Sequence, residues 1–501
     1  MTELYAPAEI RAAEAAAMEN GVSEIELMRR AAEGILQALP ETDKTIGILC
    51  GKGNNAGDGY ALAHLLSRDG RSPILYRFSD KLTPAAAHYY ELCKSDGIAE
   101  RTALEDKPFQ DCTLLVDCLF GTGFHGKVTS PFREVIEAAN ASGLPIVAAD
   151  IPSGLSAESG LGEIAIRATK TVAIGGYKYG HFLGRARDLC GELTVCDIGL
   201  APLSDAAVVE DSDLFALLAP RPHHSHKGTY GTVTLLGGSL PYSGAPRLSA
   251  LAAASLRSGC GIARLALPAC LASAALPYLL EGTLCPMPHR DGGLIFDEDA
   301  LDAAFKSATS AAIGMGMGRS DDIAEILEWA LENLSIPLVI DADGLNTLAG
   351  MDLSILSITK CNVVLTPHPK EFSRLSGIPM SDVLAHPIEY ARSFADKYGC
   401  IILLKGTSTV VTDGKDVLVV SRGSGGMATA GSGDVLAGVI AALLAWSQED
   451  LLLTVAAGAH ICGVSGEIAT DRVGSISQVA SDTARAIPDA ILAITGKVHT
   501  K

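Results

Sequence analysis

Short runs of β-branched residues alternate with alanine-rich stretches of helical pattern along nearly the whole chain. These runs predict buried strands at 45–50, 73–78, 113–120, 145–151, 170–176, 231–238, 261–268, 310–316, 337–344, 362–368, 400–406 and 416–421. Strands that alternate with helices are typical of βαβ units, which build a parallel sheet covered by helices on both faces. We therefore predict an α/β fold with three layers.

The alternation is interrupted between residues 201 and 218. This segment is polar and punctuated by prolines, which is typical of a connection between domains. A chain of 501 residues has material for two large domains. We predict one α/β/α domain at 1–208 and a second at 215–501.

The composition limits the partners that the protein can have. The net charge is −19, so nucleic acids and anionic membranes would be repelled. The 12 cysteines contain no CxxC pair, which favours buried thiols in a reducing compartment. Residues 1–21 lack the apolar segment of a signal peptide, and the apolar run 435–446 is too short to span a bilayer. We expect a cytoplasmic homo-oligomer that binds neither nucleic acid nor membrane.

The most informative segment is the glycine-rich stretch 423–434, which leads into an apolar helical run. Small residues let main-chain N–H groups converge on one point, and the N-terminus of the next helix adds the positive end of its dipole. Together they favour the binding of a phosphoryl group. Asp434 falls in the first turn of the helix. It is either a helix cap or a base that deprotonates a hydroxyl group attacking a phosphate.

Two further segments of the second domain allow two interpretations each. Lys405 and Gly406 end a strand and precede a run of hydroxyl residues, which forms either a β-hairpin turn or contacts to nucleotide phosphates. The motif "DADGLN" at 341–346 is either a strand end with a helix cap or a carboxylate near magnesium or water.

The second domain resembles the NAD(P)H-hydrate dehydratases, which have the ribokinase-like fold. The resemblance rests on "HKGTYGTVTLLGGS", "YSGAP", "GMGMG", "DADGLN", "LTPHPKEFSRL", "KGTSTVV" and "GGMATAGSGDVLAG", in this order. The chain departs from the family at Met315 and Met317, where proline and leucine are usual. The resemblance implies removal of water from the S form of hydrated NADH or NADPH (NADHX and NADPHX). ADP or ATP would be the co-substrate, with magnesium bound to the nucleotide.

The resemblance also implies roles for individual residues. Asp434 would be the base that prepares the ring hydroxyl for phosphorylation, after which the ring nitrogen expels phosphate. His368, which from the residues alone is a loop histidine between prolines, would line the hydrate site. The full hydrate site would comprise Ala245, Gly316 or Gly318, His368 and Asp434. The adenine nucleotide would be bound by Lys405, Gly406, Thr407, Ser408, Thr409 and Gly433.

In the first domain, the segment "ILCGKGNNAGDGYALAHLL" has the pattern strand, turn, helix. Gly51, Gly53 and Ala56 satisfy the dinucleotide-binding motif GxGxxA, with Asp80 as a candidate acid for the ribose, so a plain Rossmann NAD domain is one interpretation. Against it, the turn also carries two asparagines and Asp58, which a pyrophosphate turn does not need. The asparagines could also be simple left-handed turn formers.

Polar residues follow two more predicted strands of this domain. Asp117 ends one strand and precedes the flexible loop 121–127, while Asp150 and Ser153 follow another strand. Ligands of parallel sheets gather at the carboxyl ends of the strands, so these turns are expected to converge. Asn55, Asp117 and Ser153 supply hard oxygens suited to an alkali or alkaline-earth cation. Each aspartate, taken singly, could instead cap a helix.

The segments "GNNAGDGY", "VDCLFGTG" and "DIPSGL" resemble the NAD(P)H-hydrate epimerases, although Ala56 stands where the family has glycine or proline. The resemblance implies a Rossmann-like domain with a potassium ion at Asn55, Asp117 and Ser153. Asp150 would be the acid or base that lets the hydroxyl group change faces. The hydrate would be bound by Asn54, Asn55, Ala56, Gly57, Asp58, Gly121, Thr122, Gly123, Phe124, His125, Gly126, Lys127 and Asp150.

Together the two halves resemble the bifunctional NAD(P)H-hydrate repair enzymes, in which one domain interconverts the R and S hydrates and the other consumes the S form. An alternative is a kinase of a small hydroxylated metabolite with a non-catalytic, nucleotide-binding first domain, because the same phosphate-binding apparatus would serve it. A further alternative treats the first domain as a protein-binding or nucleotide-sensing module.

Overall fold

The computed structural model describes residues 1–41, 45–102, 104, 108–201, 203–251 and 257–496. The chain divides into two compact units, one of residues Glu3–Asp205 and one of residues Ala206–Lys501 together with Met1–Thr2. The two units are defined by the contacts that their residues make with one another. The domain boundaries at 208 and 215 remain predictions from the sequence. Each unit has its own sheet and its own core.

The first unit is built on a sheet whose paired strands are all parallel, in the order β4-β3-β2-β5-β6-β7-β9. Its strands are β2 (Thr45–Cys50), β3 (Ser72–Arg77), β4 (Ala99–Arg101), β5 (Leu114–Cys118), β6 (Ile146–Ala149), β7 (Lys170–Ile174) and β9 (Glu192–Cys196). The short β1 (Thr2–Tyr5) pairs with β8 (Tyr177–Lys178). The helices are α1 (Pro7–Glu19), α2 (Glu24–Ala38), α3 (Asn54–Arg68), α4 (Pro84–Ser95), α5 (Phe132–Ala141) and α6 (Ala186–Leu189).

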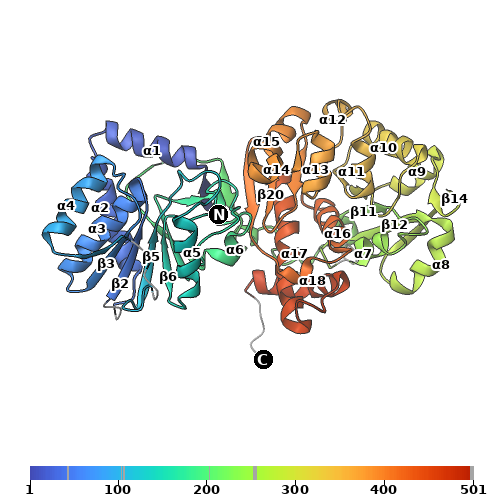
Figure 1. Cartoon of the computed structure of the whole chain (residues 1–501). Helices are drawn as coiled ribbons and strands as arrows, with labels where there is room; N and C mark the ends of the chain where they lie inside the picture. The colour runs from blue at the N-terminus through green and yellow to red at the C-terminus, as the bar shows by residue number, and fades with distance from the viewer. Residues whose placement is uncertain (42–44, 103, 105–107, 202, 252–256, 497–501) are drawn as a thin grey trace. The chain divides into compact units, whose positions relative to one another are not determined.

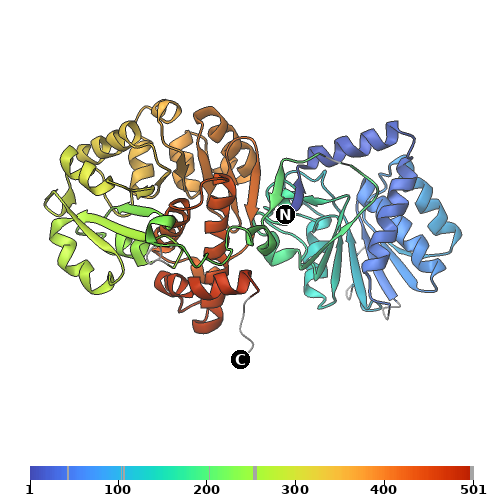
Figure 2. The same ribbon diagram turned by 180° about the vertical axis from the view of Figure 1, so that it is seen from behind.

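Strand β2 shows why this sheet is covered on both sides. Successive side chains of a strand point to opposite faces, so Ile48 packs into the core under α2, α3 and α4, while Leu49 packs into the core under α5. Burial on both faces explains the continuous apolar pattern of the strand. The blue helices α2, α3 and α4 lie together on one face, as Figures 1 and 2 show from opposite sides.

The second unit contains the strands β13-β12-β11-β16-β17-β18-β19-β20-β21-β10, in this order. Its strands are β10 (Ala206–Val208), β11 (Thr232–Leu236), β12 (Ile262–Pro268), β13 (Thr283–Met287), β16 (Ser310–Ile313), β17 (Leu338–Ile340), β18 (Val363–Leu365), β19 (Ile401–Leu404), β20 (Thr409–Thr412) and β21 (Val417–Val420), with a separate hairpin of β14 (His289–Arg290) and β15 (Gly293–Leu294). The pairs from β13 to β19 are parallel, whereas β20 is antiparallel to both neighbours.

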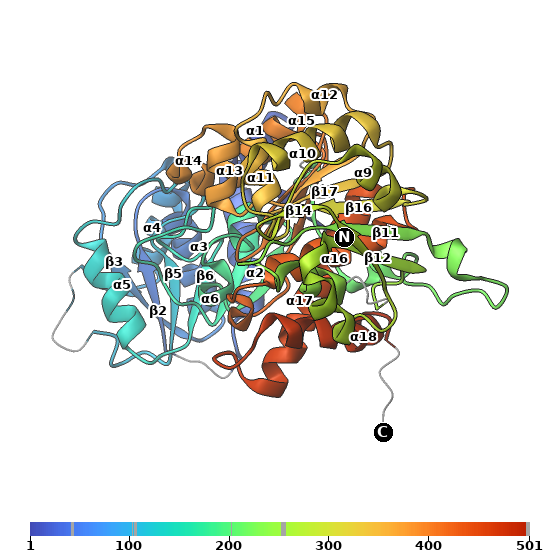
Figure 3. The ribbon, with the colours of Figure 1, turned by 90° about the vertical axis from the view of Figure 1, so that its right-hand side faces the viewer.

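Helices cover both faces of this sheet. They are α7 (Ala245–Ser249), α8 (Ala272–Ala275), α9 (Glu298–Phe305), α10 (Asp321–Asn333), α11 (Asp343–Leu348), α12 (Ile355–Ile358), α13 (Pro369–Ser376), α14 (Met380–Ala385), α15 (Pro387–Tyr398), α16 (Ser432–Leu444), α17 (Leu451–Val473) and α18 (Ala480–Ile494). The yellow and orange helices α10 to α15 lie on one side and the red helices α16 to α18 on the other (Figures 1 and 3). The predicted α/β class with parallel sheets is confirmed.

Helix α17 is long and apolar enough to cross a membrane, since its 23 residues have a mean hydropathy of 1.5 over the most apolar window. However, 72% of that window is buried inside the unit, where the helix packs against α16, α18 and the strands β19 to β21. Length and composition alone are weak evidence for a membrane span, because the buried core helix of a globular unit passes the same test.

Candidate functional site

A cavity of about 620 Å³ in the second unit lies where β17 and β19 end and α16 begins. Ligands of α/β sheets bind at the carboxyl ends of parallel strands, so this is the expected place for a site. The cavity is lined by Asp341, Ala342, His368, Pro369, Lys405, Gly406, Met427, Ala428, Thr429, Gly431, Gly433 and Asp434. The structure thus brings together four predicted positions that are far apart in sequence: His368, the Lys405–Gly406 turn, Gly433 and Asp434.

Asp434 lies in the first turn of α16 but does not cap it. Gly431 is the N-cap residue, with a left-handed φ of 94° that disfavours larger residues. Among the described residues, none donates a hydrogen bond to the Asp434 carboxylate. Burial raises the pKa of this carboxyl group to about 7, and the neighbouring Asp341 adds to the rise. A half-buried carboxyl group that receives no hydrogen bond from the described residues and faces a cavity is available for proton transfer.

Lys405 is the main positive charge of the cavity. It lies in the turn between β19 and β20, so the hairpin interpretation of this segment is correct, and the turn also lines the cavity. Its Nζ is 2.9 Å from Oδ1 of Asp341, which also accepts the Thr366 hydroxyl at 2.8 Å, and 4.0 Å from Oε2 of Glu371. Burial lowers the pKa of Lys405, but the two carboxylates outweigh it and leave the pKa raised. The amine is therefore charged at neutral pH and can attract a phosphate.

His368 is the N-cap residue of α13. Its Nδ1 accepts hydrogen bonds from the main-chain N–H groups of Lys370 at 3.1 Å and Glu371 at 3.2 Å. A ring nitrogen that accepts carries no proton, so the proton of the neutral imidazole is on Nε2, which is 3.5 Å from Oε1 of Glu371. The structure therefore gives His368 a structural role at the helix start and a position in the cavity.

The glycine motif 314–318 is anchored beside the cavity. Oδ2 of Asp343 accepts the main-chain N–H of Gly318 at 2.8 Å, so Asp343 is bound to this turn. A Cβ added at Gly316 would lie 2.8 Å from Cβ and 2.9 Å from the carbonyl oxygen of Tyr242, and the φ of Gly316 is 68°, so this position requires glycine. Ala245, Gly316 and Gly318 do not belong to the lining of the cavity around Asp434, and neither do the predicted nucleotide contacts Thr407, Ser408 and Thr409.

A second cavity, of about 850 Å³, lies in the first unit. The predicted residues that line it are Asn54, Asn55, Asp58, Gly121, Thr122, Gly123, Phe124, His125, Lys127 and Asp150. Of the other predicted residues, Ala56 and Gly57 are buried in α3, Gly126 is exposed, and Asp117 and Ser153 are buried beside the cavity. The convergence predicted for the three strand ends is therefore present in the structure.

Asp117 and Ser153 form a buried polar pair beneath this cavity. The carboxylate of Asp117 accepts the main-chain N–H of Ser153 at 2.7 Å and its hydroxyl at 2.6 Å. Burial raises the pKa of Asp117 to about 6, and the hydrogen bonds from Ser153 oppose the rise. A carboxylate that is held away from water in this way would be stabilised by a nearby cation.

Asn55 carries the observation that points to a ligand. Its side-chain amide is buried, and neither Oδ1 nor Nδ2 has a hydrogen-bond partner within the described part of the chain. Asn55 packs against Gly121, and the adjacent Phe120 donates its N–H to the hydroxyl of Ser153 at 2.8 Å. Buried polar atoms are normally satisfied, so an oxygen-binding cation at Oδ1 fits the residues present.

Asp150 is held in an uncommon conformation. Its φ is 67°, in the left-handed region, and its side chain is bound by Lys178, whose Nζ lies 2.5 Å from Oδ1. Its main-chain oxygen is 2.6 Å from Nε2 of His181. Lys178 and His181 were not among the predicted site residues. A signal was present, because "GGYKYGH" puts a lysine and a histidine just after the strand β7, where ligands gather.

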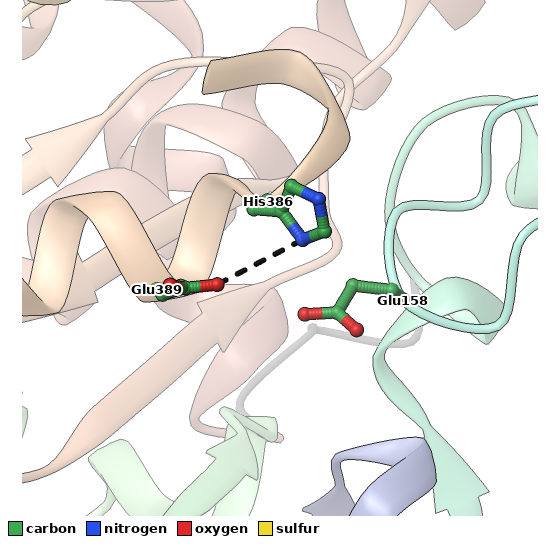
Figure 4. A group of neighbouring side chains, drawn as sticks. All are labelled: Glu158, His386 and Glu389. Atoms are coloured by element: carbon green, nitrogen blue, oxygen red, sulfur yellow. Dashed lines mark ion pairs between the residues drawn. The ribbon is translucent and has the colours of Figure 1, made fainter. Parts of the chain in front are cut away.

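An ion pair between His386 and Glu389 lies outside both cavities. Nδ1 of His386, between α14 and α15, is 3.8 Å from Oε2 of Glu389 (Figure 4). Both side chains are exposed to solvent, and exposed ion pairs of this kind contribute little to stability.

Comparison with known proteins gives a family for each unit. A family model described as NAD(P)H-hydrate dehydratase matches residues 233–489, and one described as YjeF-related protein N-terminus matches residues 24–180. The fold and the two sites thus define a two-domain α/β enzyme that joins a YjeF-related unit to a dehydratase unit.

Relatives with both halves are similar along most of this chain. The bifunctional NAD(P)H-hydrate repair enzyme Nnr of Coxiella burnetii is 34% identical, covering 96% of this chain and 98% of its own length. The Nnr enzyme of Escherichia coli is 33% identical over 92% and 88%. The chain belongs to the family of bifunctional NAD(P)H-hydrate repair enzymes.

A solved structure extends the comparison for the second unit. The ADP/ATP-dependent NAD(P)H-hydrate dehydratase of Bacillus subtilis, co-crystallised with ATP and Mg²⁺, is 28% identical with a TM-score of 0.50. It covers 57% of this chain and 98% of its own.

Proposed function

We propose that this chain repairs hydrated nicotinamide cofactors with two activities. The first unit interconverts R- and S-NAD(P)HX, and the second removes water from the S form with ADP or ATP as co-substrate. The observation that carries the proposal is Asp434. It is a half-buried carboxyl group without a hydrogen-bond donor among the described residues, and it faces a cavity shared with Lys405 and a glycine-rich helix N-terminus. Magnesium, with which the Bacillus neighbour was crystallised, would be bound mainly by the nucleotide phosphates.

The geometry supports a phosphorylation followed by elimination. Asp434 takes the proton of the ring hydroxyl, whose oxygen attacks the terminal phosphoryl group and displaces AMP or ADP. The main-chain N–H groups at the start of α16 and the charge of Lys405 stabilise the transferred group. The ring nitrogen then expels phosphate as the C–O bond breaks. Loss of a proton from the neighbouring carbon restores the double bond of NAD(P)H.

Incubation of the purified chain with mixed hydrates tests the function. We expect reduced-nicotinamide absorbance to appear with ADP or ATP, and both hydrates to be consumed. Without nucleotide, we expect only the ratio of R to S to change. A stable phosphorylated alcohol without NAD(P)H would instead establish the alternative, a kinase of a small hydroxylated metabolite.

The pH dependence of dehydration follows from the cavity. Since the pKa of Asp434 is raised to about 7, the base is protonated and inactive below this pH. We expect kcat/KM for dehydration to fall about tenfold for each pH unit below roughly 7. A profile that stays flat from pH 8 down to 5 would contradict the role of this carboxylate.

Potassium at Asn55, Asp117 and Ser153 is part of the proposal for the first unit. A bound cation would neutralise the buried carboxylate and satisfy the amide oxygen. We expect potassium, compared with choline at equal ionic strength, to raise the unfolding temperature of this unit, because a ligand that binds only the folded state stabilises it. In Asn55→Ala the effect should be lost. An equal unfolding temperature in both salts would exclude the site.

Cytoplasmic location and homo-oligomerisation also remain proposals. The net charge of −19 and the scattered cysteines support the location. Exposed large apolar side chains such as Leu280 and Ile358 support contact between copies of the chain. Light scattering after size-exclusion chromatography measures the assembly state.

A further inference from the structure

Asp150 needs support from neighbouring residues to keep its place in the cavity of the first unit. It follows β6, and its φ of 67° costs a residue with a Cβ atom conformational energy that neighbouring contacts have to offset. Its main-chain N–H donates to the carbonyl of Val172 at 2.9 Å. Strained residues of this kind concentrate at functional sites, where the surrounding structure holds them in place.

Lys178 supplies the contact to the side chain. It is 1% exposed, yet it borders the cavity, and its Nζ is 2.5 Å from both Oδ1 of Asp150 and the carbonyl oxygen of Ile174. A buried ammonium group is costly unless it is paired. Oδ1 of Asp150 also accepts the N–H of Ile174 at 3.3 Å. Oδ2, without a donor among the described residues, is left for the substrate.

His181 supplies the contact to the main chain. Its Nδ1 accepts the N–H of Lys178 at 2.9 Å, so the ring proton is on Nε2 and is donated to the carbonyl oxygen of Asp150 at 2.6 Å. Burial lowers the pKa of His181 to about 4, so the ring is neutral at physiological pH. The short segment 178–181 therefore binds Asp150 at both its side chain and its backbone.

Lys178 also acts on two other carboxyl groups of the cavity, those of Asp58 and Glu14. Asp58 and Glu14 also line the cavity, and burial together with the nearby Asp150 raises the pKa of both carboxyl groups. Lys178 lowers the pKa of both groups and Arg11 lowers that of Glu14, whereas Glu24 raises both. Of the three acids, Asp150 is the one with which Lys178 makes a direct ion pair, at 2.5 Å.

We propose that Lys178 and His181 are positioning residues of the epimerase site, which hold Asp150 in the orientation that the acid or base requires. The proposal rests on the epimerase activity proposed above. Lys178 holds Oδ1 and leaves Oδ2 for the ring hydroxyl, and His181 holds the backbone in the left-handed conformation. The deletion of the lysine side chain should leave the cavity open but Asp150 misoriented and without its counter-ion.

The test uses the full chain and measures R-to-S interconversion without nucleotide. We expect Lys178→Ala to lower kcat about 100-fold or more with a much smaller change in KM, since the lysine acts on the reacting group. Methylammonium can enter the space left by the lysine side chain, and it should raise the kcat of Lys178→Ala about tenfold. A residue with a purely structural role would show no such rescue. The matched control is Lys170→Ala, which removes a surface ion pair with Glu192 (3.2 Å) and should change the rate less than about twofold.

Two further measurements make the result decisive. Dehydration of the S form by the same sample reports folding of the second unit, and the thermal transition of the first unit reports its own folding. If Lys178→Ala unfolds the first unit, Lys178→Gln replaces it in the test. The glutamine amide keeps hydrogen-bond donors but lacks the positive charge, so this variant should be equally slow. A folded variant that retains the rate, or a loss in Lys178→Ala without rescue, overturns the proposal. A wild-type chain that does not interconvert the hydrates overturns the proposed function instead.

Discussion

Replacement of Asp434 by asparagine is expected to reduce the rate of dehydration by about three orders of magnitude, because asparagine cannot accept the hydroxyl proton. The substitution keeps the size of the side chain and leaves the contacts of α16 in place. Epimerisation takes place in the other unit and should be unchanged. The measurement is the rate of NAD(P)H formation from the S hydrate with saturating nucleotide.

The control for this variant is Asp299→Asn. Asp299 also lies in the first turn of a helix, α9, but it is exposed and outside the cavity. The rate of the control should stay within about twofold of wild type. If Asp434→Asn dehydrates the S hydrate at the wild-type rate, Asp434 is not the base.

The same variant should be more stable than wild type at alkaline pH. The pKa of Asp434 rises from its ordinary value of 3.8 to about 7 on folding, so its favourable contribution to stability is present below pH 4 and is lost as the pH rises through 7. At pH 8 the folded chain holds a partly buried charge that asparagine removes. We expect a gain on the order of 1–2 kcal/mol at pH 8, after allowance for solvent, and none near pH 3. Activity and stability are thus opposed at this residue.

Asp150→Asn is expected to slow epimerisation by about two to three orders of magnitude, because the acid or base is lost while its shape remains. In mixed hydrates with ADP or ATP, NAD(P)H should then form only up to the share of the S hydrate, whereas the wild type consumes the whole mixture. The final amount of NAD(P)H therefore measures epimerisation by the first unit, and the initial rate of its formation measures dehydration by the second.

The exposed Asp188 of α6 provides the control, since Asp188→Asn leaves the cavity intact. Full consumption of the R hydrate by Asp150→Asn at the wild-type rate would exclude Asp150 as the acid or base. It would also turn attention to Asp58, the other aspartate in the lining.

The fold could be predicted from sequence where strands are buried on both faces. The run 45–50 is continuous and apolar, and it coincides with β2 (Thr45–Cys50). The antiparallel strand β20 was not among the predicted strands, although a hairpin turn after β19 was one of the two interpretations of this segment. The strand β9 was also missed, since Glu192–Cys196 is mostly exposed or half-buried and lacks a continuous apolar pattern.

The site could be predicted where a strand end and a glycine turn coincide in sequence. Asp434 and Asp150 both follow this pattern, and both line cavities. The cap interpretation of Asp434 is wrong because the N-cap position is taken by Gly431. Lys178 and His181 could not be assigned, because their relation to Asp150 depends on how the segment after β7 folds back on the end of β6. Such contacts are set by tertiary structure and leave no local spacing.

The position of α17 in the chain has a consequence for biosynthesis. Among the described residues, this is the one helix long and apolar enough to cross a membrane, so its exposure during synthesis would offer a target for chaperones or for membrane insertion. The strands β19 to β21 and the helix α16 on which it packs precede it in sequence, whereas its other neighbour, α18, follows it. When the segment emerges, one part of its packing surface has already been translated, and α18 completes its cover only afterwards.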